Sequence, residues 1–245
     1  MTRASPETSR RPTPPGHPRR DYTLDLRGKL ADRGRAVEIM TGSGMARAEL
    51  DPGGPAEPGA VRFLLVLTHG AGGSAGSPDL LAARDAALGL GGLVARVTQP
   101  YRVKGARAPG SAVRQDAAWV EIVAALTGLV PGVPLVQGGR SNGARVACRT
   151  AAVVGARAVI ALAFPLKPPG PTGQSRLAEL RAAGAGGAAV LVVNGERDPF
   201  GIPAPQDAAR VVVLPGETHA LTRHPAAVGA AVGSWLAEQL DAAGS

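Results

Sequence analysis

The stretch at residues 134–148 constrains the fold of this chain more than any other part of the sequence. It reads as a short apolar strand, then an abrupt turn, then a helix that starts near Asn142. Gly139, Ser141 and Gly143 give the turn a Gly-x-Ser-x-Gly spacing. Such a turn leaves little room for a Cβ two residues before and two residues after its centre, and glycine fills both positions. The stretch therefore predicts a sharp strand-to-helix turn with Ser141 at its tip.

Apolar segments alternate with helix-forming segments along most of the remaining chain. Residues 34–51 predict an antiparallel hairpin with a turn at residues 41–44. Further strands are expected at residues 61–67, 93–97, 158–163, 189–193 and 211–214. Further helices are expected at residues 80–88, 111–126, 175–183 and 226–240. These alternating spacings predict an α/β fold with a doubly wound, mostly parallel sheet and the hairpin at its edge.

Some local details can be tested against the structure. Ser77 and Pro78 predict an N-cap and first position for the helix at residues 80–88. Residues 99–104 are expected to form a loop. Five apolar side chains of the helix at residues 111–126 are expected to face the sheet: Val113, Trp119, Ile122, Val123 and Leu126.

The chain of 245 residues is long enough for one substantial domain, which we place at residues 34–245. We expect residues 1–33 to be a disordered tail rich in arginine and proline, because its first twenty residues carry almost nothing apolar. Those twenty residues also carry half of the net charge of +8. The charge therefore does not predict a specific nucleic-acid site, although association through the tail is an alternative.

Composition also bears on the compartment. No apolar segment follows the N-terminal arginines, so we expect no secretory signal, and no apolar run is long enough to cross a bilayer. Cys148 is the only cysteine, which rules out a disulfide within the chain and favours a reducing, cytoplasmic setting. We interpret Cys148 as buried filler in the helix after the turn rather than as a nucleophile.

Three side chains that suit acyl transfer follow three different strands. The carboxyl ends of parallel strands meet at one edge of a sheet, so Ser141, Asp198 and His219 are expected to converge there. A serine hydroxyl needs a base to take its proton, and the base needs a group that holds its tautomer. We assign Ser141 as nucleophile, His219 as base and Asp198 as the orienting acid. Their order along the chain is that of the α/β-hydrolases.

Alternatives for these roles exist nearby. His224 could replace His219, but Pro225 after it suggests the start of the last helix. Glu196 would point from the wrong place in its turn, and Asp207 reads as a solvated residue of a following helix. His69 is interpreted as a structural hydrogen-bonding residue.

An oxyanion needs fixed hydrogen-bond donors. The backbone N–H of Asn142 follows the nucleophile directly, and a second N–H should come from the glycine-rich turn after the strand at residues 61–67, from Ala71 or its neighbour Gly70. Arg140 and Arg145 flank Ser141 and either bind an anionic part of a substrate or pair with carboxylates.

Cofactor and metal chemistry find no support in the sequence. There is no cluster of histidine and cysteine with metal-ligand spacing. The glycine-rich segment at residues 69–74 lacks the Gly-Lys-Ser/Thr of a P-loop and the full spacing of a dinucleotide-binding fingerprint. We therefore expect no cofactor and no metal, and a small-molecule substrate as the partner.

Several motifs together resemble one known family. They are Leu64-Val-Leu-Thr-His-Gly-Ala-Gly-Gly73, Pro100-Tyr-Arg102, Gly138-Gly-Arg-Ser-Asn-Gly-Ala-Arg145, Phe164-Pro-Leu-Lys-Pro-Pro-Gly170, Arg197-Asp-Pro-Phe-Gly201 and Glu217-Thr-His219. They are similar to the small α/β-hydrolases related to dienelactone hydrolase, and most of all to the branch of the NSL-complex subunit 3 and the testis-expressed hydrolase-like proteins. The resemblance covers roughly residues 60–240 and implies an α/β-hydrolase fold with Ser141, Asp198 and His219 as triad.

The resemblance does not carry the substrate with it. Dienelactone hydrolase uses a cysteine nucleophile, whereas this chain has Ser141. Hydrolase lids are commonly inserted after the strand at residues 158–163, and the short connection there predicts no large cap domain. We expect an open pocket, covered at most by residues 164–171, with Phe164 contacting the substrate. The expected activity is hydrolysis of a small ester, thioester or amide, and the alternative is a catalytically silent binding or scaffold protein.

Overall fold

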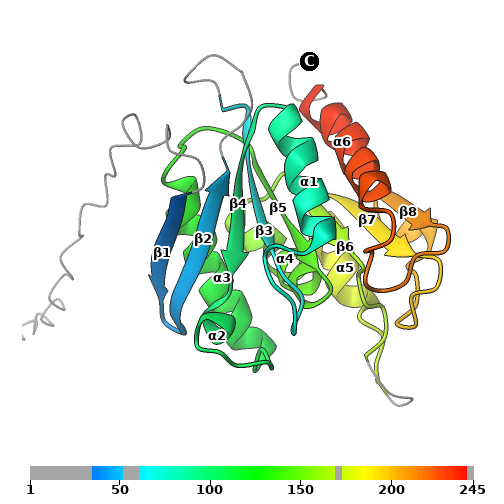
Figure 1. Cartoon of the computed structure of the whole chain (residues 1–245), viewed down its shortest axis with the longest axis horizontal. Coiled ribbons are helices and arrows are strands. Elements are labelled where there is room, and N and C mark those ends of the chain that lie inside the picture. Colours follow the sequence, from blue (N-terminus) through cyan, green and yellow to red (C-terminus); the bar gives the residue numbers. More distant parts are fainter. Residues whose placement is uncertain (1–34, 52–60, 169–172, 242–245) are drawn as a thin grey trace, which may run out of the picture.

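The computed structural model describes residues 35–51, 61–168 and 173–241, and the expected tail at residues 1–33 lies outside them. Eight strands form one sheet in the order β1-β2-β4-β3-β5-β6-β7-β8 (Figure 1). The strands are β1 (Arg35–Thr41), β2 (Gly44–Asp51), β3 (Phe63–Thr68), β4 (Gly92–Thr98), β5 (Leu135–Arg140), β6 (Ala158–Leu162), β7 (Ala189–Gly195) and β8 (Arg210–Leu214). The helices are α1 (Pro78–Gly89), α2 (Pro100–Val103), α3 (Ala112–Thr127), α4 (Asn142–Val154), α5 (Leu177–Ala185), α6 (Pro225–Asp241) and a 3₁₀ turn, η1 (Pro205–Asp207).

The sheet is mostly parallel with an antiparallel edge. β1 and β2 form the expected hairpin, and β2 also pairs antiparallel with β4. Every pairing from β4 through β3 to β8 is parallel. The predicted doubly wound sheet with an edge hairpin is therefore confirmed.

Helices cover both faces of the sheet. α1 and α6 pack side by side on one face, and α3, α4 and α5 cover the other (Figure 1). Successive side chains of a strand point to opposite faces, so a strand in the middle must be apolar at every position. β3 shows this, because Leu65 packs in the cluster with Trp235 of α6 and Leu64 in the cluster with Trp119 of α3. The continuous apolar run that predicted this strand reflects burial on both sides.

Two local predictions were wrong. Residues 99–104 contain the short helix α2 instead of a loop, and Pro100 stands at its first position. Val113 does not face the sheet, since its side chain is 78% exposed. Gln115 takes the inward position there because it lies four residues before Trp119, one helical turn away on the same face. Ser77 occupies the predicted N-cap position of α1, but its side chain makes no capping hydrogen bond.

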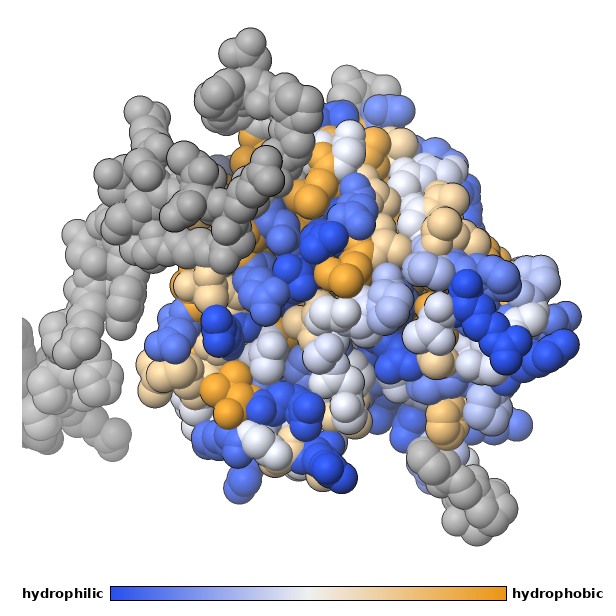
Figure 2. Space-filling model, in the orientation of Figure 1, coloured by the Kyte–Doolittle hydropathy of each residue, from blue (hydrophilic) through white to orange (hydrophobic). Residues whose placement is uncertain are grey.

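The surface on the side of α1 and α6 is mixed. Figure 2 shows small hydrophobic areas scattered among hydrophilic residues on that side. Among the helices that the structure describes, none could span a lipid bilayer.

Short connections leave one edge of the sheet open. Residues 163–176 link β6 to α5, so no cap domain is inserted there. The turns after β3, β5, β7 and β8 lie at the carboxyl ends of neighbouring parallel strands. This edge is where ligands bind in sheets of this kind, and it holds the candidate site.

Candidate active site

Ser141 lies on a strained turn between β5 and α4. Its backbone has φ 52° and ψ −109°, a conformation that non-glycine residues rarely adopt. A Cβ built on Gly139 or on Gly143 would lie 2.6 Å from the carbonyl oxygen of Thr68. Glycine is therefore required on both sides of the serine, because β3 passes too close for a side chain.

The three side chains predicted for acyl transfer meet at this turn. His219 follows β8, and its Nε2 lies 2.9 Å from Ser141 Oγ. Asp198 follows β7, and its Oδ2 lies 2.8 Å from His219 Nδ1. Three turns that are far apart in sequence thus bring a hydroxyl, an imidazole and a carboxylate into one hydrogen-bonded chain.

The contacts orient the imidazole. An ionised carboxylate can only accept, so Nδ1–H donates to Asp198 and leaves the lone pair of Nε2 facing the hydroxyl of Ser141. Phe200 packs edge to face against the ring of His219, with centroids 4.6 Å apart. The histidine is thereby held in the tautomer that can take a proton from the serine.

Asp198 is itself held by groups that the sequence analysis missed. Its Oδ1 accepts from the backbone N–H of Phe200 at 2.9 Å, and its Oδ2 accepts from Asn194 Nδ2 at 3.2 Å. The buried amide of Asn194 also exchanges hydrogen bonds with the backbone of Phe164, 2.9 and 3.1 Å long. Asn194 stands at the end of β7, and its position among apolar strand residues was the one available signal of a buried polar role.

The turn after β3 lies against Ser141. A Cβ on Gly70 would be 3.4 Å from Ser141 Cβ. The Gly70 carbonyl accepts from His69 Nδ1 at 2.8 Å and from the N–H of Gly73 at 3.1 Å. Because carbonyl and N–H point in opposite directions across a trans peptide, these bonds fix the N–H of Ala71 in the other direction. The turn is thus held in one orientation, as an oxyanion donor requires.

His69 is a structural part of that turn, as expected. Its Nε2 accepts from the backbone N–H of Gln99 at 3.1 Å, so Nδ1 must carry the proton that bonds the Gly70 carbonyl. Burial lowers the pKa of His69, and the nearby charge of Arg102 also lowers it. A neutral ring suits this double contact, because one nitrogen accepts and the other donates.

Two further contacts fix the surroundings of the expected oxyanion donors. Tyr101 donates its hydroxyl proton to the Ala71 carbonyl at 3.1 Å, and burial raises the pKa of Tyr101 to about 12, so it stays protonated. Asn142 begins α4, where backbone N–H groups lack partners within the helix. Its side chain donates to Gln115 Oε1 at 2.7 Å.

The remaining predicted residues lie around this centre. Phe164 is fully buried in the core on the α3 and α4 face, so its side chain has no exposed surface from which to contact a substrate. His224 precedes α6 and Glu196 accepts from the N–H of Gly216, so neither takes part in the contacts of Ser141. Asp207 is not solvated as expected, since it is buried in η1 and pairs with Arg181 at 2.7 Å.

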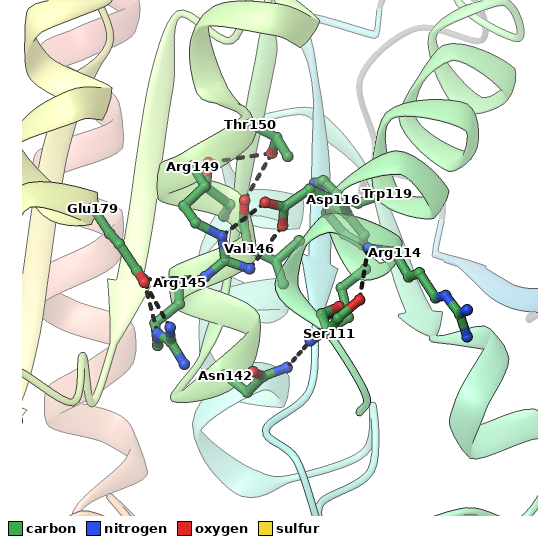
Figure 3. Close-up of polar contacts among 12 residues, drawn as sticks. Ser111, Arg114, Asp116, Trp119, Asn142, Arg145, Val146, Arg149, Thr150 and Glu179 are labelled. Carbon is green, nitrogen blue, oxygen red and sulfur yellow. Dashed lines mark hydrogen bonds and ion pairs between the residues drawn. The ribbon is translucent and has the colours of Figure 1, made fainter. Parts of the chain in front are cut away.

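The two arginines that flank the serine both pair with carboxylates. Arg140 Nε lies 3.1 Å from Asp79 Oδ2. Arg145 makes two hydrogen bonds to Glu179, 2.6 and 2.8 Å long (Figure 3). The side chain of Arg149, one helical turn further along α4, bonds Asp116 through two nitrogens.

Cys148 is buried in α4, and burial raises the pKa of its thiol to about 12. This placement agrees with the interpretation as core filler, because a nucleophilic cysteine needs a stabilised thiolate. Within residues 35–51, 61–168 and 173–241, no group of three histidine, cysteine or acidic side chains could hold a metal ion.

Comparison with known families gives one match. Residues 61–219, more than half of the chain, match the family model described as an alpha/beta hydrolase domain. The matched range includes Ser141, Asp198 and His219. None of the curated proteins compared with this chain matches it.

Solved structures are similar over most of the chain. Est1E from Butyrivibrio proteoclasticus has a TM-score of 0.68 and 18% identity, with 84% of this chain and 99% of that chain covered. XC6422 from Xanthomonas campestris, described as an α/β serine hydrolase without lid, has a TM-score of 0.65 and 18% identity, with 84% and 94% covered. Dienelactone hydrolase from Anabaena variabilis has a TM-score of 0.64 and 18% identity, with 84% and 96% covered. At such identities the likeness shows the fold alone.

Proposed function

Because the chain belongs to the α/β hydrolase family, we propose that it is a serine hydrolase that forms an acyl-enzyme on Ser141. The observation that carries the proposal is the hydrogen-bonded chain from Asp198 through His219 to Ser141, with distances of 2.8 and 2.9 Å. Hydrolase and esterase neighbours on the same fold support a hydrolytic reaction in general terms.

The first half of the reaction acylates the serine. Ser141 Oγ attacks the carbonyl carbon of the substrate while His219 Nε2 takes its proton, and Asp198 stabilises the resulting imidazolium. The C–O, C–S or C–N bond to the leaving group then breaks, and His219 returns the proton to the leaving group. The second half repeats these steps with water as nucleophile, which releases the acid and restores the serine.

Charge develops on the carbonyl oxygen in both tetrahedral intermediates. We assign the N–H groups of Asn142 and Ala71 as its donors, with Gly70 as the alternative to Ala71. The bonds that fix the Gly70 carbonyl support Ala71, because they orient its N–H before a substrate arrives. In enzymes of this type, loss of one such donor costs about 3 kcal/mol of transition-state stabilisation.

The substrate that fits best is a small ester, thioester or amide, and a carboxylic ester is our first choice. The short link between β6 and α5 supports this, because no cap domain is available to enclose a long chain. Activity on short-chain acyl esters should exceed activity on long-chain esters. A strong preference for the long chain would contradict this substrate class.

Narrower assignments stay predictions. They are the relationship to the NSL-complex subunit 3 branch, the cytoplasmic setting suggested by the single cysteine, and substrate binding by Arg140. The contacts of Arg140 with Asp79 and with the backbone of His219 point to another role.

The test of the proposed function is covalent labelling with an uncharged fluorophosphonate probe, which reacts only with an activated serine. We expect the wild-type protein to be labelled, and labelling to disappear in Ser141→Ala and in His219→Ala. Absence of labelling in a folded wild-type protein would overturn the proposal and favour the binding or scaffold alternative.

A further inference from the structure

Arg140 contacts three elements of the candidate site at once. Its Nε lies 3.1 Å from Asp79 Oδ2 at the start of α1. Its Nη2 donates to the backbone carbonyl of His219 at 3.0 Å. A Cβ on Gly70 would lie 3.3 Å from its Nη1, so the guanidinium also lies beside the turn after β3. Arg140 immediately precedes Ser141, so one side chain links the nucleophile to the histidine loop and to the expected oxyanion turn.

The partner of Arg140 is an unusual carboxylate. The Asp79 side chain is 0% exposed, against 18% for Arg140. Neither oxygen of Asp79 has a hydrogen-bond partner of good geometry among the described residues. Burial raises the pKa of Asp79, while the nearby Ser77 hydroxyl and the charge of Arg140 act in the opposite direction. The second position of α1 favours a negative charge through the helix dipole.

A buried ion pair of this kind adds little to stability. Removing two charges from water costs about as much as their attraction returns, and apolar side chains of similar size often replace such pairs without loss. Stability alone is therefore a weak reason for a buried Asp79 and Arg140. The contacts of the guanidinium beyond Asp79 suggest a better one.

The histidine loop needs a tether on its backbone. Asp198 fixes the ring of His219 through Nδ1, but the position of the ring also depends on the chain that carries it. Two residues later, Leu221 has φ 48°, so the loop follows an uncommon backbone path. Arg140 bonds the carbonyl of His219 itself, between the ring and this bend.

We propose that Arg140 is a positioning residue: anchored by Asp79, its guanidinium holds the His219 backbone and the turn at Gly70 in register with Ser141. The inference rests on the proposed function and deepens it. It differs from substrate binding, in which the guanidinium would bond an anionic group of the substrate.

Lysine separates the two functions of the guanidinium. Arginine presents several donors in a rigid plane, whereas lysine has one ammonium group. Arg140 uses Nε for Asp79 and Nη2 for the His219 carbonyl. In Arg140→Lys, the single ammonium nitrogen can pair with Asp79, but no second nitrogen is held in a fixed plane toward that carbonyl. The variant should therefore fold with a Tm close to that of the wild type while losing the tether.

The experiment measures labelling by the uncharged fluorophosphonate as a function of probe concentration. We expect Arg140→Lys to lower the maximal labelling rate about tenfold or more, because a misplaced base costs rate even when the chemical groups remain. The probe concentration at half-maximal rate should stay unchanged. A substrate-anion role predicts the opposite pattern, with no effect on an uncharged probe.

A second variant guards against misfolding, and a third serves as control. Arg140→Met combined with Asp79→Leu removes both buried charges, so it should fold and still label slowly. Arg149→Lys makes the same substitution at an ion pair that touches neither loop, and it should label at the wild-type rate.

The outcomes separate the two proposals. Labelling of Arg140→Lys and of the double variant at the wild-type rate would overturn the positioning role and leave the proposed function intact. A change confined to the half-maximal concentration would also overturn it. An unlabelled wild-type protein would overturn the proposed function, and the positioning role with it.

Discussion

Arg140 and Arg149 lie on either side of Ser141 and both pair with carboxylates, yet their surroundings differ. Arg140 pairs with one fully buried carboxylate, donates a hydrogen bond to the histidine loop and lies beside the turn after β3. Arg149 bonds Asp116 of α3 through two nitrogens and Glu179 of α5 through a third. The first arginine joins loops at the site. The second joins helices, and Figure 3 shows its contact with Asp116.

The difference shows how one turn can serve chemistry and scaffold. The Arg140 side chain bonds the loop of His219, whereas Arg145 and Arg149 of α4 pair with carboxylates on the neighbouring helices α3 and α5. We therefore expect changes at Arg140 to affect rate more than stability, and changes around Arg149 to affect stability more than rate.

The largest effect on stability should come from Arg149→Met. It leaves Asp116 without its bidentate partner and removes one donor from Glu179, while the arginine side chain is only 14% exposed. We expect the free energy of unfolding to fall by about 2–4 kcal/mol, because a partly buried carboxylate loses its counter-charge. Urea denaturation followed by circular dichroism measures this.

The matched control is Arg210→Met, which breaks an exposed pair with Glu238 and should leave the urea midpoint unchanged. An equal loss of maximal labelling rate in folded Arg149→Met and in Arg140→Lys would contradict the distinction between Arg149 and Arg140.

A smaller effect, dependent on pH, is expected for Glu179→Gln. Burial tends to raise the pKa of Glu179, but hydrogen bonds and charges from Arg145 and Arg149 outweigh it, so the pKa lies below its usual value. A lowered pKa in the folded state stabilises the fold above the unfolded pKa, and this contribution is lost as pH falls through the folded pKa. At pH 7 we expect Glu179→Gln to be about 1–2 kcal/mol less stable than the wild type.

The difference in the free energy of unfolding between the wild type and Glu179→Gln should stay constant from pH 7 to pH 5. It should shrink below about pH 4.3, where the carboxylate of Glu179 in the unfolded chain takes up its proton. Unfolding by urea at several pH values gives the curve. A gap that widened on acidification would contradict the assigned direction.

The smallest effect concerns the thiol of Cys148, which lies in α4 beside Arg149. Burial raises the pKa of this thiol to about 12, and the charge of Glu179 adds to the shift, so reaction with a disulfide reagent at pH 8 should be slow. Local opening of the layer formed by α3, α4 and α5 should speed the reaction of this thiol. We expect modestly faster reaction in Arg149→Met and the wild-type rate in Arg140→Lys, and equal acceleration in both would remove the distinction between scaffold and site.

Much of the fold followed from local patterns. Apolar runs between helical segments predicted the parallel sheet, because a strand covered on both faces must be apolar throughout. The exposure of Val113 was not predicted, since an apolar residue near the start of a helix does not reveal which face of the helix it lies on. Helix α2 was not predicted either, because four residues are too few to show a helical period.

In the candidate site too, some features could be predicted from sequence and others could not. The turn at Ser141 could be predicted from sequence, because two glycines at fixed spacing are a local requirement of backbone packing. The sequence also predicted Asp198 and His219 as site residues, because the carboxyl ends of the strands in a parallel sheet share one edge. The three side chains lie within hydrogen-bond distance of one another at that edge, and their catalytic roles stay predictions until labelling is measured.

The groups that hold these side chains could be identified only from the folded chain. Asn194 is bonded to Asp198 and to the backbone of Phe164, 30 residues away. Arg140 meets a carboxylate on α1 and a carbonyl after β8, and no local pattern specifies either contact. The reason is physical: a backbone turn is fixed by its own few residues, whereas the partner of a long polar side chain depends on which distant loops the packed sheet brings within reach.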